Sequence, residues 1–95
     1  MTLSIQLHGV IFEEESDITL TETLVRYRVS KTELLAMVEE GILDPVQASH
    51  PVESWHFNPV AIKRLQITQR LERDLQINLP GAALILDLLE LLERR

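Results

Sequence analysis

The sequence contains no cysteine, only 3 glycines and few aromatic side chains, which make up 4% of the residues. Without cysteine the chain has no disulfide, no thiolate nucleophile and no cysteine-ligated zinc or iron-sulfur site, a composition compatible with a reducing compartment. The scattered glycines form no glycine-rich phosphate loop. No stretch reaches about 18 uncharged apolar residues, and the N-terminus lacks the charged region of a secretory signal. We therefore expect neither secretion nor a membrane span, and a cytoplasmic location.

Positive charge is scarce in the first part of the chain. The whole sequence has 9 basic and 15 acidic side chains and a net charge of -6. Residues 1–58 contain ten of the acidic side chains and three basic ones, whereas residues 59–95 carry a net charge of +1. Nonspecific affinity for nucleic acid comes from lysine and arginine side chains that neutralise phosphates, so this distribution disfavours a nucleic acid partner. A basic protein partner is the better expectation.

At 95 residues, of which 45% are hydrophobic, the chain is large enough for one core and too small for two. We expect a single domain over residues 1–95 that begins with a strand region at residues 1–20. From Thr2 to Leu7 apolar and polar residues alternate, the two-residue period of a strand with one buried face. The acidic run Glu13–Glu15 then interrupts this pattern. It is typical of a solvated turn, with a docking surface for a basic partner as the alternative.

Two closely spaced helix starts predict a helix-turn-helix over residues 21–41. Thr21 is a candidate cap for a first helix that runs to about Arg28. Ser30 and Glu33 have the spacing of a capping box, which opens a second helix that ends at Gly41. The connection between these helices, about two residues, has the length of a helix-turn-helix turn.

The second half of the chain predicts a β wing followed by two C-terminal helices. The wing covers residues 42–58, with one strand at Ile42 and Leu43 and the other around Trp55 and Phe57, and we expect both aromatic side chains to be buried. A long helix follows at residues 59–75, and an apolar helix capped by Asn78 covers residues 78–95. The expected fold class is therefore mainly α, with a small N-terminal strand.

The last helix is apolar around most of its circumference, which is more than a surface helix needs. We interpret the excess as an interface with a second copy of the chain or with another partner, and we expect a homodimer, because a 95-residue fold offers little material to wrap a helix completely. The alternative is a helix buried on both sides by its own domain. The expected interface residues are Ile85, Leu88, Leu89 and Leu92.

Residues suited to metal binding or catalysis form no recognisable pattern. The three histidines, His8, His50 and His56, match no zinc spacing, and we expect no metal and no cofactor. The sequence has no nucleophile elbow and no pair of carboxylates placed to converge in a cleft, so we expect that the protein is not an enzyme. Arg26 and Arg28 precede the second helix, where they either contact phosphate or pair with acidic neighbours; we favour the pairing.

The order of short helix, capped second helix, wing and long helix resembles the winged helix-turn-helix of MerR-type regulators. Within that group, the sequence is similar to the CbpM family of chaperone modulators. The likeness covers roughly residues 18–92 and rests on residues 29–34, 40–45, 55–57, 69–71, 74–75 and 77–83. The resemblance implies a protein that binds the J-domain of a CbpA-like or DnaJ-like co-chaperone. It also implies inhibition of the co-chaperone and DNA-binding activities of that partner.

The second helix of the expected helix-turn-helix is acidic where a DNA-reading helix is basic. A reading helix presents arginine, lysine, asparagine or glutamine to DNA, whereas this segment offers Lys31 alone. We therefore expect it to meet the basic helix that the resemblance implies for the J-domain, in competition with Hsp70 for the same surface. The expected contact residues are Glu33, Glu39, Glu40 and Asp44. The alternative is a MerR-like or excisionase-like transcriptional regulator that binds DNA.

Overall fold

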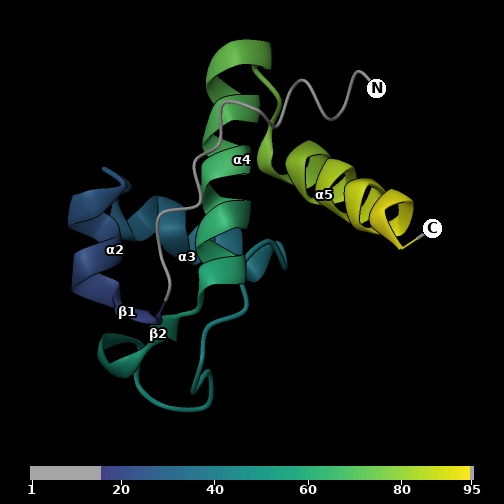
Figure 1. Ribbon diagram of the computed structural model, residues 1–95. Coiled ribbons are helices and arrows are strands. Elements are labelled where there is room, and N and C mark those ends of the chain that lie inside the picture. Colours follow the sequence, from purple (N-terminus) through teal and green to yellow (C-terminus); the bar gives the residue numbers. More distant parts are fainter. Residues whose placement is uncertain (1–15, 95) are drawn as a thin grey trace.

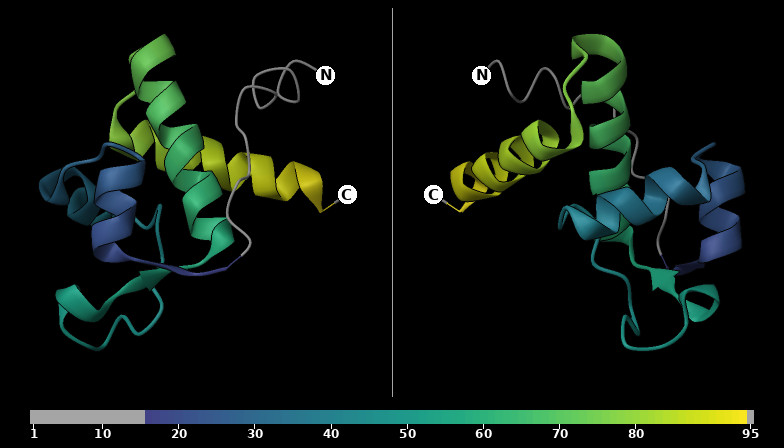
Figure 2. Two further views of the ribbon diagram at one scale, coloured as in Figure 1. Left: turned by 60° about the vertical axis from the view of Figure 1, so that its left-hand side comes forward. Right: turned by 180° about the vertical axis from the view of Figure 1, so that it is seen from behind.

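One long helix, α4 (Pro59–Leu75), forms the centre of the fold (Figure 1). The computed structural model describes residues 16–94. Before α4 the chain forms strand β1 (Ile18–Thr19), helix α2 (Leu20–Arg26), helix α3 (Lys31–Glu39), a 3-10 turn (Val52–Ser54) and strand β2 (His56–Phe57); helix α5 (Leu79–Glu93) follows it. Helices α2 and α3 lie on one side of α4 and α5 lies on the other, as the views in Figure 2 show. The described part is mainly helical, as expected.

The helix-turn-helix is held by two capping boxes. In α3 the expected box is present, since the Ser30 hydroxyl accepts from the amide of Glu33 at 3.1 Å and the Glu33 carboxylate caps Ser30 in return. The cap of α2 is Thr19 and not Thr21, which lies inside the helix. A capping box requires a glutamate three residues after the cap, and Glu22 satisfies this spacing only for Thr19. The helix also ends at Arg26, earlier than expected.

The expected β hairpin within residues 42–58 is wrong. Strand β2 pairs antiparallel with β1, with Ile18 opposite Phe57, and the wing itself contributes only an isolated bridge between Val46 and His56. Ile42 and Leu43 are both buried in the core, at 1% and 2% exposure. A strand with one covered face would leave one of two consecutive side chains exposed, whereas both side chains here belong to the core.

The two aromatic residues of the wing differ in burial. Phe57 is fully buried and lies in the core with Leu34 and Leu65, whereas Trp55 is half-buried at the edge of this core. The expectation that both would be buried is therefore correct only for Phe57. Trp55 lies before β2, so the strand register does not orient it, and its indole N–H donates to the carbonyl of His50 at 3.0 Å. This bond keeps the polar edge of the ring at the surface.

Helices α4 and α5 span the ranges that the sequence predicts, except that α5 ends at Glu93. The side chains of Asn58 and Asn78 cap them and accept from the amides of Ala61 and Gly81 at 2.8 and 2.9 Å. A left-handed residue, Gln76, ends α4. The connection is short, so α5 packs back against α4. The strand expected at Thr2–Leu7 and the run Glu13–Glu15 lie outside the described residues.

Candidate functional site

The candidate site is an acidic surface at the C-terminal end of α3. Glu39 and Glu40 are exposed in its last turn, and Asp44 is exposed just beyond the helix. Gly41, with a φ of +79°, ends the helix and turns the chain, so that Ile42 enters the core while Asp44 returns to the surface. Three of the four expected contact residues therefore present free carboxylate surface to solvent.

Glu33 is placed differently from the other three residues. Its carboxylate belongs to the capping box at the start of α3, where it accepts from the Ser30 hydroxyl at 3.1 Å. Its charge also reaches Glu72 on α4: burial raises the pKa of the Glu72 carboxyl, and the charge of Glu33 raises this pKa further. No sequence spacing connects Glu72 to Glu33, so this interaction is not predictable from the sequence. Glu33 is primarily a structural residue of the helix start.

Lys31, the one cationic side chain of α3, is already paired. Its ammonium group lies 2.9 Å from the Glu53 carboxylate, which comes from the wing. The hydrogen bond and charge of Lys31 lower the pKa of Glu53. The helix that would enter a DNA groove therefore offers no unpaired cation to a phosphate or base edge. This arrangement strengthens the acidic character of the surface.

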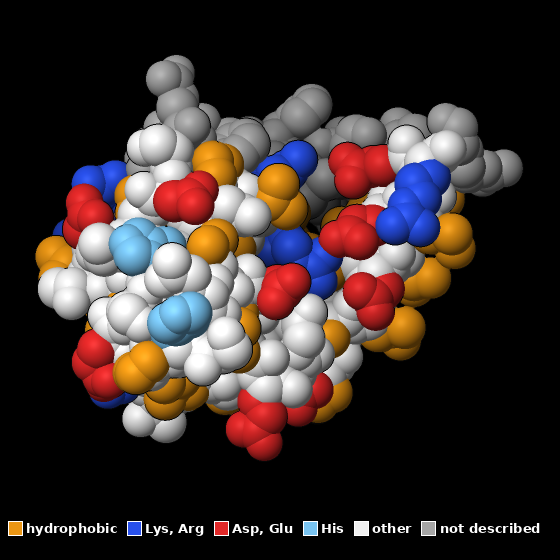
Figure 3. Space-filling view, turned by 90° about the horizontal axis from the view of Figure 1, so that it is seen from below, with side chains coloured by type: hydrophobic (Ala, Val, Ile, Leu, Met, Phe, Trp, Pro, Cys, Tyr) orange, Lys and Arg blue, Asp and Glu red, His pale blue; other side chains and the backbone are white. Residues whose placement is uncertain are grey.

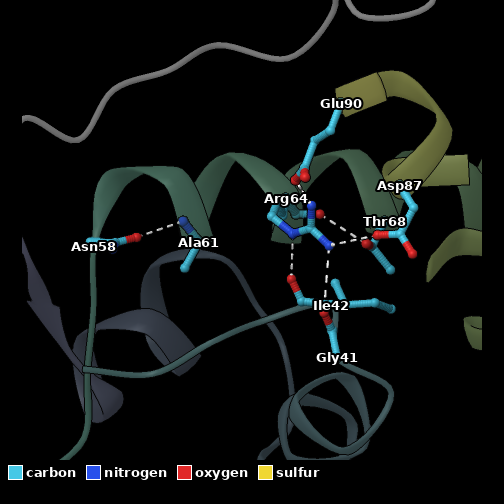
Figure 4. Close-up of polar contacts among 8 residues, drawn as sticks. All are labelled: Gly41, Ile42, Asn58, Ala61, Arg64, Thr68, Asp87 and Glu90. Carbon is cyan, nitrogen blue, oxygen red and sulfur yellow. Dashed lines mark hydrogen bonds and ion pairs between the residues drawn. The ribbon is translucent and has the colours of Figure 1, made fainter. Parts of the chain in front are cut away.

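Arg64 of α4 connects the end of α3 to α5 (Figure 4). Its guanidinium donates to the carbonyl of Ile42 at 2.6 Å and to that of Gly41 at 3.5 Å. On the other side it forms an ion pair with Glu90 and lies 4.0 Å from Asp87, both on α5. The Arg64 side chain is only 15% exposed. These contacts hold α5 against the turn that follows α3. No local sequence pattern predicts them, because the partners lie more than 20 residues apart.

Two clefts flank the ion pair between Arg64 and Glu90. The first, of about 440 Å³, lies between α4 and α5 over Ile67, Leu86 and Leu89. The second, of about 380 Å³, lies between the turn after α3, the start of α4 and α5, and Asp44 lines it. In Figure 3 red carboxylate side chains surround a hollow in which blue cationic side chains are visible. The acidic surface of α3 thus extends toward α5.

Helix α5 has a buried face and an exposed apolar face. Ala82, Leu86 and Leu89 are buried within the chain, and Ile85 packs against the core. Of the expected interface residues, Leu88 and Leu92 are exposed, at 49% and 39%, whereas Leu89 is 8% exposed. Leu84 and Leu91 are more exposed still, at 60% and 61%. The exposed leucines, hereafter the leucine stripe, are Leu84, Leu88, Leu91 and Leu92.

The remaining candidate residues form no site in the described part of the chain. Within residues 16–94 no group of three histidine, aspartate or glutamate residues is placed to hold a metal ion; His8 lies outside this range. Arg26 lies 3.7 Å from Glu22, as the pairing interpretation expects. Arg28 adopts a φ of +53° at the turn between α2 and α3. None of the helices in this range combines the length and apolar character needed to cross a bilayer.

Comparison with known proteins identifies the family. A family model described as MerR HTH family regulatory protein matches residues 18–94. A protein of Coxiella burnetii named chaperone modulatory protein CbpM is 36% identical over 87 residues, which cover 92% of this chain and 80% of the relative. The protein of the same name from Citrobacter koseri is 35% identical over 76% of this chain and 69% of the relative. The chain belongs to the CbpM family.

Membership of the CbpM family agrees with the observed helix-turn-helix fold. CbpM proteins are named as chaperone modulators, and this supports the same broad role for the chain. Both the CbpM name and the MerR regulatory family suggest a protein that acts by binding and not by catalysis. No solved structure was found to match the chain significantly.

Proposed function

We propose that the protein binds the J-domain of a CbpA-like or DnaJ-like co-chaperone through the acidic end of α3. The observation that carries this proposal is the charge of a helix-turn-helix whose second helix exposes Glu39 and Glu40 and pairs its single lysine with Glu53. The resemblance to CbpM implies a J-domain partner with a basic helix. Opposite charges on two surfaces steer their encounter and set the register of the complex.

The proposed mechanism is competition. A J-domain stimulates Hsp70 through its basic helix, so a protein that covers this helix excludes Hsp70 and inhibits the co-chaperone. No catalytic step is needed, because occupancy alone accounts for the inhibition and, in the same complex, for reduced DNA binding by the co-chaperone. The complex forms in the cytoplasm, which suits a chain without cysteine.

The test is a titration of a purified J-domain with the protein over a series of salt concentrations. Replacement of both Glu39→Lys and Glu40→Lys places positive charge against the basic helix, and we expect affinity to fall at least about tenfold. The matched control, Asp17→Lys with Glu93→Lys, changes the net charge equally at exposed positions outside α3. Unchanged affinity in the α3 variant, or an equal loss in the control, would contradict the proposed contact surface.

DNA binding is the second candidate function, favoured by the match to the MerR HTH regulatory family. A library of DNA duplexes, titrated in parallel with the J-domain, separates the two candidates. The J-domain proposal expects no retained duplex. Retention that weakens steeply with salt, without a J-domain complex, would assign the fold to a DNA-binding regulator.

The leucine stripe supports a homodimer. Four exposed leucines on one side of α5 form a contiguous apolar surface on an otherwise charged protein. A second copy of the chain offers the same stripe, so two α5 helices can cover each other about a two-fold axis. The stripe replaces the interface expected from the sequence, since Leu89 and Ile85 already pack within their own chain.

A further inference from the structure

The second cleft has features of a site for one side chain. It measures about 380 Å³ and lies beyond the acidic surface of α3, where the start of α4 meets α5. Three carboxylates line it, from Asp44, Asp87 and Glu90, together with the apolar side chains of Val60 and Ala61. We call this second cleft the α4–α5 cleft. It is distinct from the first cleft, which lies over Ile67, Leu86 and Leu89. Only one of its carboxylates, that of Asp44, belongs to the surface predicted from the sequence.

The charge of the α4–α5 cleft is unbalanced. Arg64 lies on its inner side, where the guanidinium is occupied by the carbonyls of Gly41 and Ile42 and by Glu90. One arginine against three carboxylates leaves two negative charges in excess. Asp87 is 73% exposed and lies 4.0 Å from Arg64, so most of its carboxylate faces solvent. A further cation in the cleft would meet Asp44 and Asp87 without displacing Arg64.

The wall of the cleft suits the stem of a long side chain. Val60 is 61% exposed although it is apolar, and it stands beside buried Ala61 at the start of α4. Lysine and arginine side chains place their methylene groups along apolar surface while the charged group remains among polar atoms. Exposed Val60 therefore provides apolar surface for the methylene stem, and the carboxylates of Asp44 and Asp87 provide contacts for the charged group.

We propose that the α4–α5 cleft binds a lysine or arginine side chain from the basic helix of the J-domain. The methylene stem lies on Val60, and the charged group contacts Asp44 and Asp87. This inference rests on the proposed function for the identity of the partner. It adds Val60 and Asp87 to the interface, so that the co-chaperone contacts α4 and α5 as well as the end of α3.

The first test measures J-domain affinity in variants that leave the Arg64 contacts with Gly41, Ile42 and Glu90 in place. We expect Asp87→Asn to weaken binding about threefold to tenfold and Asp87→Lys to weaken it more, as for charge pairs across an interface. Val60→Ser should also weaken binding, whereas Glu93→Gln, the same charge change six residues further along α5 and outside the cleft, should not. Circular dichroism checks that each variant is folded. Wild-type affinity in folded Asp87→Lys would overturn the inference.

The second test does not depend on a J-domain. Hexalysine and hexaarginine peptides are titrated into the isotopically labelled protein while backbone amide signals are recorded by NMR. We expect shifts at Gly41, Asp44, Ala61 and Asp87, and their loss in the double variant Asp44→Asn with Asp87→Asn. Shifts confined to other acidic positions would refute the cleft as a cation site. Cleft shifts without any J-domain binding would retain the site and refute the proposed function instead.

Discussion

At the scale of single residues, the charges of Glu33 and Glu72 destabilise the folded state, because the two carboxylates repel each other. Burial and the charge of Glu33 hold the pKa of Glu72 above its ordinary value of 4.5. A carboxyl with a raised pKa stabilises the folded state only while it is protonated, and this contribution is lost as pH rises through the folded pKa. Ionised Glu72 is thus mildly destabilising at neutral pH.

We therefore predict that Glu72→Gln is more stable than the wild type at pH 7, by about 0.5 kcal/mol, the size of a solvent-screened charge effect. The gain should shrink as pH falls below the ordinary value of 4.5, because Glu72 then becomes protonated in both states. Urea unfolding at pH 7 and at acidic pH measures this difference in stability.

Asp74→Asn is a control with the opposite expected effect. Arg73 and Arg70 lower the pKa of Asp74, so the stabilising charge of Asp74 is present at pH 7 and lost on acidification. A Glu72→Gln gain that is independent of pH would contradict this account.

The exposure of the residues in the candidate site was predictable from the sequence, but their contacts with other helices were not. Exposure of Glu39, Glu40 and Asp44 follows from their position at and beyond the end of a capped helix, a local feature that sequence spacing reports. The Glu72 and Arg64 contacts depend on how separate helices are placed, which sequence spacing does not report. Arg64 lies 22 residues from Ile42 and 26 from Glu90.

At the scale of elements, the caps of α3 and α5 were predicted correctly, whereas the cap of α2 and the pairing of β2 were not. Ser30 and Asn78 define helix starts through bonds to residues three positions ahead, and these bonds form as the sequence indicates. Strand β2 pairs with Ile18–Thr19, which precedes α2 and α3 in the sequence. The sequence favoured a local hairpin within residues 42–58 instead. Local hydrogen bonds carry a sequence signature, whereas pairing between distant strands is decided by which side chains fill the core.

The placement of α5 depends on Arg64. We predict that Arg64→Gln lowers the free energy of unfolding by about 2 to 3 kcal/mol, because it removes the bonds to the turn after α3 and leaves Glu90 without its partner. Arg64→Lys should recover only part of this loss, since an ammonium group cannot reproduce the planar fork. Thermal or urea unfolding of both variants measures the effect.

The control for Arg64 is Arg73→Gln. Arg73 also pairs with a carboxylate, that of Asp74, but its side chain is 67% exposed, and exposed ion pairs contribute about 0 to 1 kcal/mol. Equal destabilisation by the two substitutions would mean that Arg64 acts as an ordinary surface charge and does not hold α5 in place.

At the scale of the whole molecule, α5 shows why an interface cannot be assigned from an apolar helix alone. Its sequence is apolar around most of its circumference, so composition does not distinguish the apolar side that packs on α4 from the apolar side left open. Only the packing assigns Leu86 and Leu89 to the interior and Leu84 and Leu91 to the surface. Of the residues expected on the exposed side, Leu88 and Leu92 are exposed, whereas Leu89 is buried and Ile85 packs against the core.

The homodimer proposal predicts that charge on the leucine stripe separates the two copies. We expect Leu84→Lys with Leu88→Lys to sediment as a monomer in analytical ultracentrifugation at concentrations where the wild type sediments at twice the mass of one chain. The control, Val25→Lys with Leu75→Lys, adds the same charge at apolar positions that are 74% and 54% exposed on α2 and α4, and it should remain dimeric. Charge disfavours the dimer in the first pair only, because two lysines per copy would be brought together in an apolar contact between identical surfaces. A monomeric wild type, or equal dissociation of the two double variants, would contradict the proposal that the leucine stripe forms a homodimer. J-domain binding by the monomeric stripe variant would show that each copy carries its own complete binding site.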